Sequence, residues 1–217
     1  MMAMDITIKN SWRALGLASL LLVLSVFGFQ GRAQHLPDEL HFNLDWQVNA
    51  PIGTDFANHL SGWGMSFEFG YEVAGPWSLG AFASFHTNHQ YVERQTIHLS
   101  PTQALTTDQQ HSAFQVPFGA LVSYSLYDNG YVQPYVTAKL GAMYQQNTTY
   151  FNTAGYYERP WGFYVSPEIG VNIHPLKYSR FGFHVAAYYS YGTNETDLLN
   201  YAESGRSNLG FRLGICF

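Results

Sequence analysis

Large apolar side chains recur at every second position in eight separate segments between Leu40 and the end of the chain. A period of two residues is typical of β-strands that bury or expose one apolar face. No stretch after residue 38 shows the 3.6-residue period of a helix. The pattern therefore predicts eight strands, at residues 40–48, 63–71, 77–85, 114–126, 132–144, 161–173, 181–191 and 208–217.

The connections between these segments alternate in length. Residues 74–76, 128–130 and 175–179 have the composition of tight turns, and Asn129-Gly130 is a strong hairpin signal. Residues 49–60, 86–110, 145–160 and 192–207 form longer, more polar connections. This layout predicts an all-β fold: a single eight-stranded antiparallel up-and-down transmembrane β-barrel with short periplasmic turns and longer extracellular loops.

The alternation alone does not say which face of the strands is the outer one. In a soluble, lipocalin-like barrel the apolar face would line the interior, but the opposite face carries few charges and many glycines. An eight-stranded barrel has an interior just wide enough to be filled by side chains. We therefore expect the apolar face to contact lipid and the glycine-bearing face to line the lumen. Pro117 and Pro167 lie within strands, where we expect missing hydrogen bonds or bulges.

A few charged residues fall on the inward face, and they are expected to form a structural polar network that plugs the lumen. Lys139 and Glu168 should face each other on neighbouring strands, whereas Arg212 could reach either Asp45 or Glu68. A proton or solute relay is the alternative, but paired charges in a narrow lumen block passage. The predicted network is Asp45, Glu68, Lys139, Glu168, Arg212 and His184.

Aromatic residues toward the strand ends suggest the two girdles that flank a bilayer. The predicted girdle residues are Trp63, Trp77, Trp161, Tyr144 and Tyr189. The last strand ends on Phe217, with Ile215 and Leu213 on the same face. This pattern resembles the C-terminal signal that the outer-membrane barrel assembly machinery recognises, so we expect that machinery and outer-membrane lipid as partners.

The first thirty-three residues have the composition of a secretory signal peptide. Lys9 and Arg13 precede an apolar run over residues 14–29, and small residues at Gly31 and Ala33 suit signal peptidase. The run is shorter than the roughly 20 residues of a spanning helix. We therefore predict a signal peptide at 1–33, a barrel domain at 34–217, and export to the outer membrane of a Gram-negative cell.

Charge and reactive residues exclude several functions. Without residues 1–33 the chain has 7 basic and 14 acidic residues, a balance that argues against nucleic acid. His111-Ser112 is the nearest candidate for hydrolase chemistry, but adjacent strand residues point to opposite faces. His86 and His89 also fall on opposite faces, which disfavours a metal site. No catalytic, cofactor or metal site is predicted.

Two runs, "QVPFGALVSYSLYDNGYVQPYVTAKLGAMYQ" and "YVSPEIGVNIHPL", resemble the small outer-membrane β-barrel family of OmpX and the OmpA membrane domain, and its Bacteroidetes-type members in particular. The resemblance implies the barrel architecture, but its members range from adhesion to envelope maintenance to secretion, and no residue-level site transfers. We predict a non-enzymatic outer-membrane protein with a plugged lumen that acts through its extracellular loops. The loop at residues 86–110 is the best candidate for binding a surface partner. An accessory role in an outer-membrane secretion system, of the PorT-like type, and a narrow small-solute channel are the alternatives.

Overall fold

The computed structural model describes residues 40–217 except 101, 152–153, 178 and 199–200. The contacts divide the chain into residues 1–37 and 38–217, and each described residue belongs to the second unit. The predicted signal peptide lies outside the described residues and stays a prediction. The strands are β1 Leu40–Ile52, β2 Gly64–Ala74, β3 Trp77–Ser100, β4 Gln103–Ser125, β5 Val132–Phe151, β6 Ala154–Glu158, β7 Trp161–Ile173, β8 Gly182–Leu198 and β9 Tyr201–Cys216.

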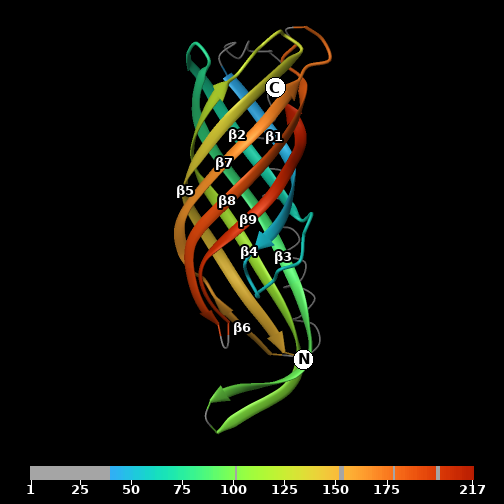
Figure 1. Ribbon diagram of the computed structural model, residues 1–217, viewed down its shortest axis with the longest axis vertical. Coiled ribbons are helices and arrows are strands. Elements are labelled where there is room, and N and C mark those ends of the chain that lie inside the picture. The colour runs from blue at the N-terminus through green and yellow to red at the C-terminus, as the bar shows by residue number, and fades with distance from the viewer. Residues whose placement is uncertain (1–39, 101, 152–153, 178, 199–200) are drawn as a thin grey trace, which may run out of the picture. The chain divides into compact units, whose positions relative to one another are not determined.

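Eight of these strands form a closed antiparallel ring (Figure 1). The ring runs β1-β2-β3-β4-β5-β7-β8-β9, and β9 pairs back onto β1 from Asn43↔Cys216 to Ile52↔Ser207. The short strand β6 pairs with the last residues of β5 and lies outside the ring order. The predicted all-β, eight-stranded barrel is thus confirmed. In the described part of the chain, no helix has the length and apolarity that crossing a membrane requires.

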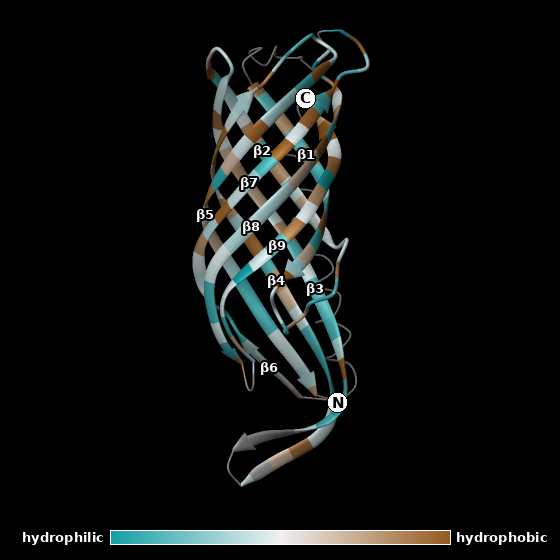
Figure 2. Ribbon diagram, in the orientation of Figure 1, coloured by the Kyte–Doolittle hydropathy of each residue, from teal (hydrophilic) through white to brown (hydrophobic). Residues whose placement is uncertain are grey.

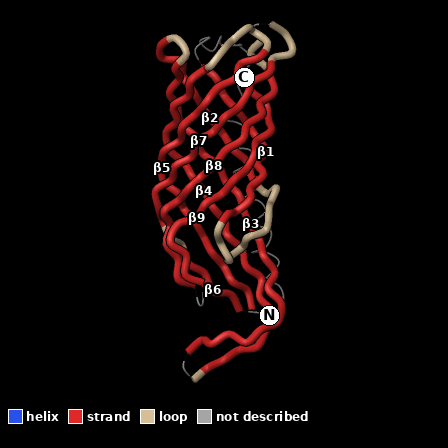
Figure 3. Tube along the Cα trace, in the orientation of Figure 1, coloured by secondary structure: helices blue, strands red, loops and turns tan. Residues whose placement is uncertain are grey.

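The two ends of the barrel differ in the length of their connections. The β2–β3, β4–β5 and β7–β8 turns lie at the same end as Phe217 (Figure 3). At the other end all strands of the ring except β2 and β7 run past the predicted boundaries, and β3 and β4 stay paired out to Ser100↔Gln103. The predicted loop at 86–110 is therefore mostly a projecting two-stranded hairpin.

That extension has a simple physical reason. Strand pairing depends on backbone hydrogen bonds, whereas the period-two apolar pattern depends on having a bilayer on one side of the wall. Beyond the apolar belt both faces of a strand can be polar, so the pattern fades while the pairing continues. Figure 2 shows mostly hydrophilic colours along the far part of β5, whereas the outermost end of β4 also carries a hydrophobic band.

The outer wall is apolar and its inner face is polar or small. Strand β8 alternates strictly between buried and exposed along its whole length. Among the outward side chains, Phe163 is 81% and Leu140 is 61% exposed. Such a continuous apolar belt is what a bilayer requires and water disfavours.

Strands β4 and β5 approach closely where two inward glycines are paired, Gly119 and Gly141. A Cβ at Gly141 would overlap the Phe118 carbonyl oxygen. Glycine is therefore required there by the packing of the wall.

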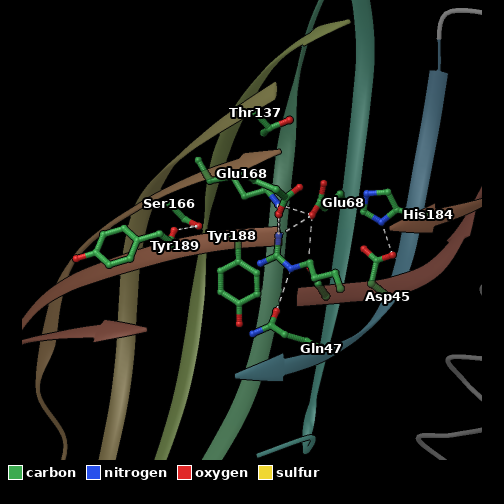
Figure 4. A network of polar contacts seen from close by, with 12 residues as sticks. Asp45, Gln47, Glu68, Thr137, Ser166, Glu168, His184, Tyr188 and Tyr189 are labelled. Atoms are coloured by element: carbon green, nitrogen blue, oxygen red, sulfur yellow. Dashed lines mark hydrogen bonds and ion pairs between the residues drawn. The ribbon is translucent and has the colours of Figure 1, made fainter. Parts of the chain in front are cut away.

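The two inner-strand prolines interrupt the ladder without shifting its register. The β7–β8 ladder has no pair at Ser166 or Pro167, although Val165↔Tyr191 and Glu168↔Tyr188 keep the same register. Ser166 Oγ donates a hydrogen bond of 2.7 Å to the Tyr189 carbonyl, beside the proline that has no N–H to offer (Figure 4). The loss of ladder hydrogen bonds that we predicted at prolines is therefore seen at Pro167. The β-bulge that we predicted as the alternative is absent there.

Candidate functional site

A cluster of four charged side chains lies across the middle of the lumen (Figure 4). Lys139 Nζ is 2.7 Å from Glu168 Oε2 and also contacts Glu68 Oε1. Arg212 Nη1 is 3.1 Å from Glu68 Oε1 and also contacts Glu168 Oε2. The four side chains come from β2, β5, β7 and β9, and none is more than 5% exposed. We call this set the ion cluster; its two positive and two negative charges balance.

Strand register explains how the ion cluster forms. Lys139 pairs with Ser166, and Thr137 pairs with Glu168, so Lys139 and Glu168 are diagonal neighbours on one face. Diagonal neighbours on a sheet are within reach of long side chains. Arg212 lies on β9, across the lumen, and its guanidinium spans to both carboxylates.

A second group of polar side chains continues from the ion cluster. Tyr135 donates to Glu168 Oε1 at 3.0 Å and its hydroxyl also contacts His184 Nε2. His184 Nδ1 lies 2.5 Å from Asp45 Oδ1. Of the two partners considered for Arg212, the structure brings it to Glu68, and Asp45 meets His184 instead. The six lumen residues named from the sequence therefore form one connected network through Tyr135.

Sequence reasoning missed two members of this network. Tyr135 lies four residues before Lys139 on the same face of β5, so the period of two would have placed it in the lumen. Gln47 accepts a 3.1 Å hydrogen bond from Arg212 Nε. Arg212 also has an aromatic neighbour, because its guanidinium carbon lies 4.4 Å from the centroid of the Tyr188 ring.

Further from the turns, the lumen is filled first by an apolar group and then by amides. Phe82, Leu121, Met143 and Tyr164 pack together beside the ion cluster. Asn49 then donates to Asn88 at 2.9 Å and to Asn208 at 3.2 Å, and Asn208 donates to Gln115 at 3.2 Å. These amides are almost completely buried. The lumen is therefore also packed with side chains between the ion cluster and the end of the barrel opposite the turns.

The β1–β2 connection closes the far mouth of the barrel. Phe56 and Ala57 are 1% and 0% exposed, and the Phe56 ring stacks on His111 with centroids 4.5 Å apart. Arg206 Nη2 donates to the Phe56 and Ala57 carbonyls at 3.2 and 3.0 Å, and Glu203 is 3.3 Å from its other amino group. We call residues 53–61 the lid. The sequence predicted an outward loop here and held no signal for its inward fold.

The lid carries two residues with left-handed backbone, Gly53 at φ +68° and Ala57 at φ +52°. A positive φ is unfavourable for alanine, so the contacts around Ala57 must hold it in place. The buried guanidinium of Arg206 supplies two of those contacts.

The aromatic residues predicted for the girdles lie at different heights on the wall. Trp77 packs edge-on against Tyr124 beside the turns, with centroids 4.8 Å apart. Trp161 packs against Tyr144 at 5.2 Å toward the other end. Trp63, just before β2, is 78% exposed. Tyr189 lies in the middle of β8, because that strand runs on to Leu198 instead of ending at residue 191.

The end of the chain is held in the closing seam. Phe217 and Phe42 exchange two backbone hydrogen bonds of 2.9 and 3.0 Å. Leu213 pairs with Trp46 and Ile215 with Leu44 on β1. Recognition of these three C-terminal residues by an assembly machinery stays a prediction.

The histidines considered for chemistry do not gather. His86 points into the lumen, within 3.1 Å of Gln47, whereas His89 is exposed on the outer face. His111 is buried under the lid and Ser112 points the other way. Within the described ranges, no three His, Cys, Asp or Glu residues lie close enough together to hold a metal ion.

Comparison with solved structures finds small outer-membrane barrels. Neisserial surface protein A shares 12% identity, over 82% of this chain and 96% of its own, at a TM-score of 0.48. Ail of Yersinia pestis shares 16% identity, over 82% and 96%, at a TM-score of 0.39. OprG of Pseudomonas aeruginosa shares 12% identity, over 82% and 93%, at a TM-score of 0.45. A search among curated proteins finds no match.

A sequence family provides the assignment. The pattern of the family described as outer membrane protein beta-barrel domain matches residues 19–215, which is most of the chain. The closed ring of strands and its apolar outer belt agree with that description. The turn end therefore faces the periplasm and the hairpin end the cell exterior. The chain belongs to the outer membrane protein beta-barrel domain family and lies in the outer membrane of a Gram-negative cell.

Proposed function

We propose that this protein is a non-enzymatic outer-membrane barrel that is closed to solutes and acts through its extracellular end. The observation that carries the proposal is the ion cluster, which joins β2, β5, β7 and β9 across the lumen. The lid adds a second closure at the extracellular mouth. A solute would have to pass both.

Opening the ion cluster is energetically costly. Its four side chains are almost fully buried, and separating a buried charge from its partners costs several kcal/mol. The neighbouring amides and apolar side chains also fill the space that a solute would need. Such packing favours a structural role for the lumen over conduction.

The extracellular side offers an extended surface instead. The β3–β4 hairpin continues past Gln110↔Tyr150, where the β4–β5 pairing begins, so its outer part is a two-stranded ribbon. It exposes Tyr91, at 62%, and Leu105, at 38%. Aromatic and apolar side chains on a projecting element are typical of protein recognition. This ribbon is the proposed contact surface for a partner.

Single-channel recording in planar bilayers tests the closed barrel. We expect the purified protein to show no discrete conductance steps at neutral pH. A variant with Glu68, Lys139, Glu168 and Arg212 all replaced by alanine keeps the net charge and empties the centre of the lumen. This variant shows whether the assay detects an opened barrel. Reproducible steps from the wild-type protein would contradict the proposal and favour the narrow channel.

A further inference from the structure

A hollow of about 480 Å³ lies on the extracellular side of the barrel wall, at the base of the β3–β4 hairpin. It is lined by residues 59–63 of the β1–β2 connection, residues 89–91 of β3 and Gln110 of β4. Asn88 Nδ2 donates to the His59 carbonyl at 3.1 Å. The Asn58 N–H donates to Gln90 Oε1 at 3.2 Å. These bonds join the connection to β3, so the two sides of the hollow are held in place without a ligand.

The hollow lies where the apolar belt of the wall ends. Along the outward face of β3 the side chains change from Phe85 to His89, and along that of β4 they change from Phe114 to Gln110. Trp63 lies just before the lipid-facing part of β2, and tryptophan is enriched at the level of lipid headgroups. The sugars of outer-leaflet headgroups and of surface glycans are therefore within reach of this hollow.

The side chains of the hollow have the chemistry that a sugar ring requires. Trp63 and Tyr91 are 78% and 62% exposed, so their rings are open to a ligand. The side chains of His59, His89 and Gln110 are exposed and make no hydrogen bond to another described residue. A pyranose has an apolar C–H face that packs on an aromatic ring, and hydroxyls that pair with amides and imidazoles. The described lining contains no carboxylate, ammonium or guanidinium group, which favours a neutral ligand.

We propose that this hollow binds a neutral pyranose sugar. The C–H face of the sugar packs on the Trp63 indole, and its hydroxyls pair with the His89 and Gln110 side chains. The Tyr91 hydroxyl donates to Asp108 at 3.3 Å, so its ring is positioned at the side of the hollow. The site goes beyond the function proposed above, because it does not depend on whether the barrel conducts or on a protein partner at the hairpin.

Chemical shifts of ¹⁵N-labelled protein in phosphatidylcholine nanodiscs test the site. We expect at least one of methyl glucoside, methyl galactoside and methyl mannoside to shift the Trp63 indole N–H and the Gln90 amide with saturation. Glycerol at the same hydroxyl concentration should leave both signals unchanged. A second arm uses nanodiscs that contain diacylglycerol bearing the hexose that binds. The same shifts in these discs without soluble sugar would identify a lipid headgroup as the source, and shifts with soluble sugar alone would identify a free glycan.

Two variants and a matched control decide the outcome. Trp63→Ala and Gln110→Ala, followed by the Gln90 amide, should each weaken binding about two- to tenfold, the range for one ring contact or one hydrogen bond. Both side chains are exposed, and the Trp63 carbonyl still accepts from the Thr87 N–H, so the fold is kept. Trp161→Ala removes an exposed tryptophan at the same end of the wall but outside the hollow, and should leave binding unchanged. No saturable shift with any of the three glycosides, equal shifts with glycerol, or unchanged affinity in both variants would overturn the proposal.

Discussion

Replacing Lys139 with methionine should strongly destabilise the barrel. Methionine has nearly the length of lysine, so the change removes a charge and leaves little empty space. Lys139 Nζ contacts Glu68 and lies 2.7 Å from Glu168. Without it, two buried carboxylates share the single positive charge of Arg212.

The magnitude follows from the balance of charges. The wild-type ion cluster has two positive and two negative groups, whereas Lys139→Met leaves an excess buried negative charge. Removing one partner from a buried ion pair costs about 3–5 kcal/mol, because the remaining charge is uncompensated. Adding Glu168→Gln restores neutrality, and glutamine can still accept from Tyr135. The double variant should therefore be more stable than Lys139→Met alone.

Reversible urea unfolding from phospholipid vesicles measures these differences. The four proteins of the cycle are wild type, Lys139→Met, Glu168→Gln and the double variant, each followed by tryptophan fluorescence and by heat-modifiable mobility on gels. We expect a coupling free energy of at least about 1 kcal/mol between the two positions. A Lys139→Met protein within about 0.5 kcal/mol of wild type would mean that the carboxylates are solvated, which refutes the closed lumen.

Three other substitutions separate the wall, the packing and the lid. Leu213→Arg, on the lipid-facing side of β9, should cost about 2–4 kcal/mol in the same unfolding assay, whereas Thr106→Arg on the projecting hairpin should cost almost nothing; equal costs would contradict the lipid-facing assignment. Gly141→Ala should cost about 1–3 kcal/mol through overlap with the β4 backbone, whereas a Cβ at Gly155 meets a tyrosine ring at 3.3 Å and a backbone oxygen only at 3.9 Å, so Gly155→Ala should be tolerated; similar unfolding midpoints would refute that reasoning. Arg206→Gln weakens two charge-assisted hydrogen bonds to lid carbonyls, so chymotrypsin should cut the lid more than about tenfold faster, and unchanged cleavage would show that the lid is held by other contacts.

The sequence predicted the part of the fold that a bilayer imposes. The bounds of β7, Trp161–Ile173, agree with the alternation, because the strand crosses the apolar belt and ends near it. The far halves of β3 and β4 were missed, since polar residues such as Gln90 and Gln109 give no period there. The short strand β6 pairs with the outermost part of β5, in the same region.

The sequence predicted which charged side chains point into the lumen. It predicted less well which of them contact one another. The sequence placed Lys139 and Glu168 opposite each other on neighbouring strands, but the partner of Arg212 depends on how strands stagger around the closed ring. The inward fold of the lid left no trace in the sequence, because one phenylalanine in a polar segment has no periodicity. Nothing in the sequence indicates that Arg206 holds the lid either, because this role depends on β9 lying next to the β1–β2 connection.

Docking of the lid also has a consequence for biogenesis. Phe56 follows the first strand, His111 belongs to β4 and Arg206 to the last strand, so the pocket for Phe56 is complete only when the two chain ends have met. An inserting intermediate with an open seam lacks half of that pocket. Protection of the lid from chymotrypsin should therefore begin only when β9 pairs with β1. This step comes after the individual hairpins have inserted into the bilayer.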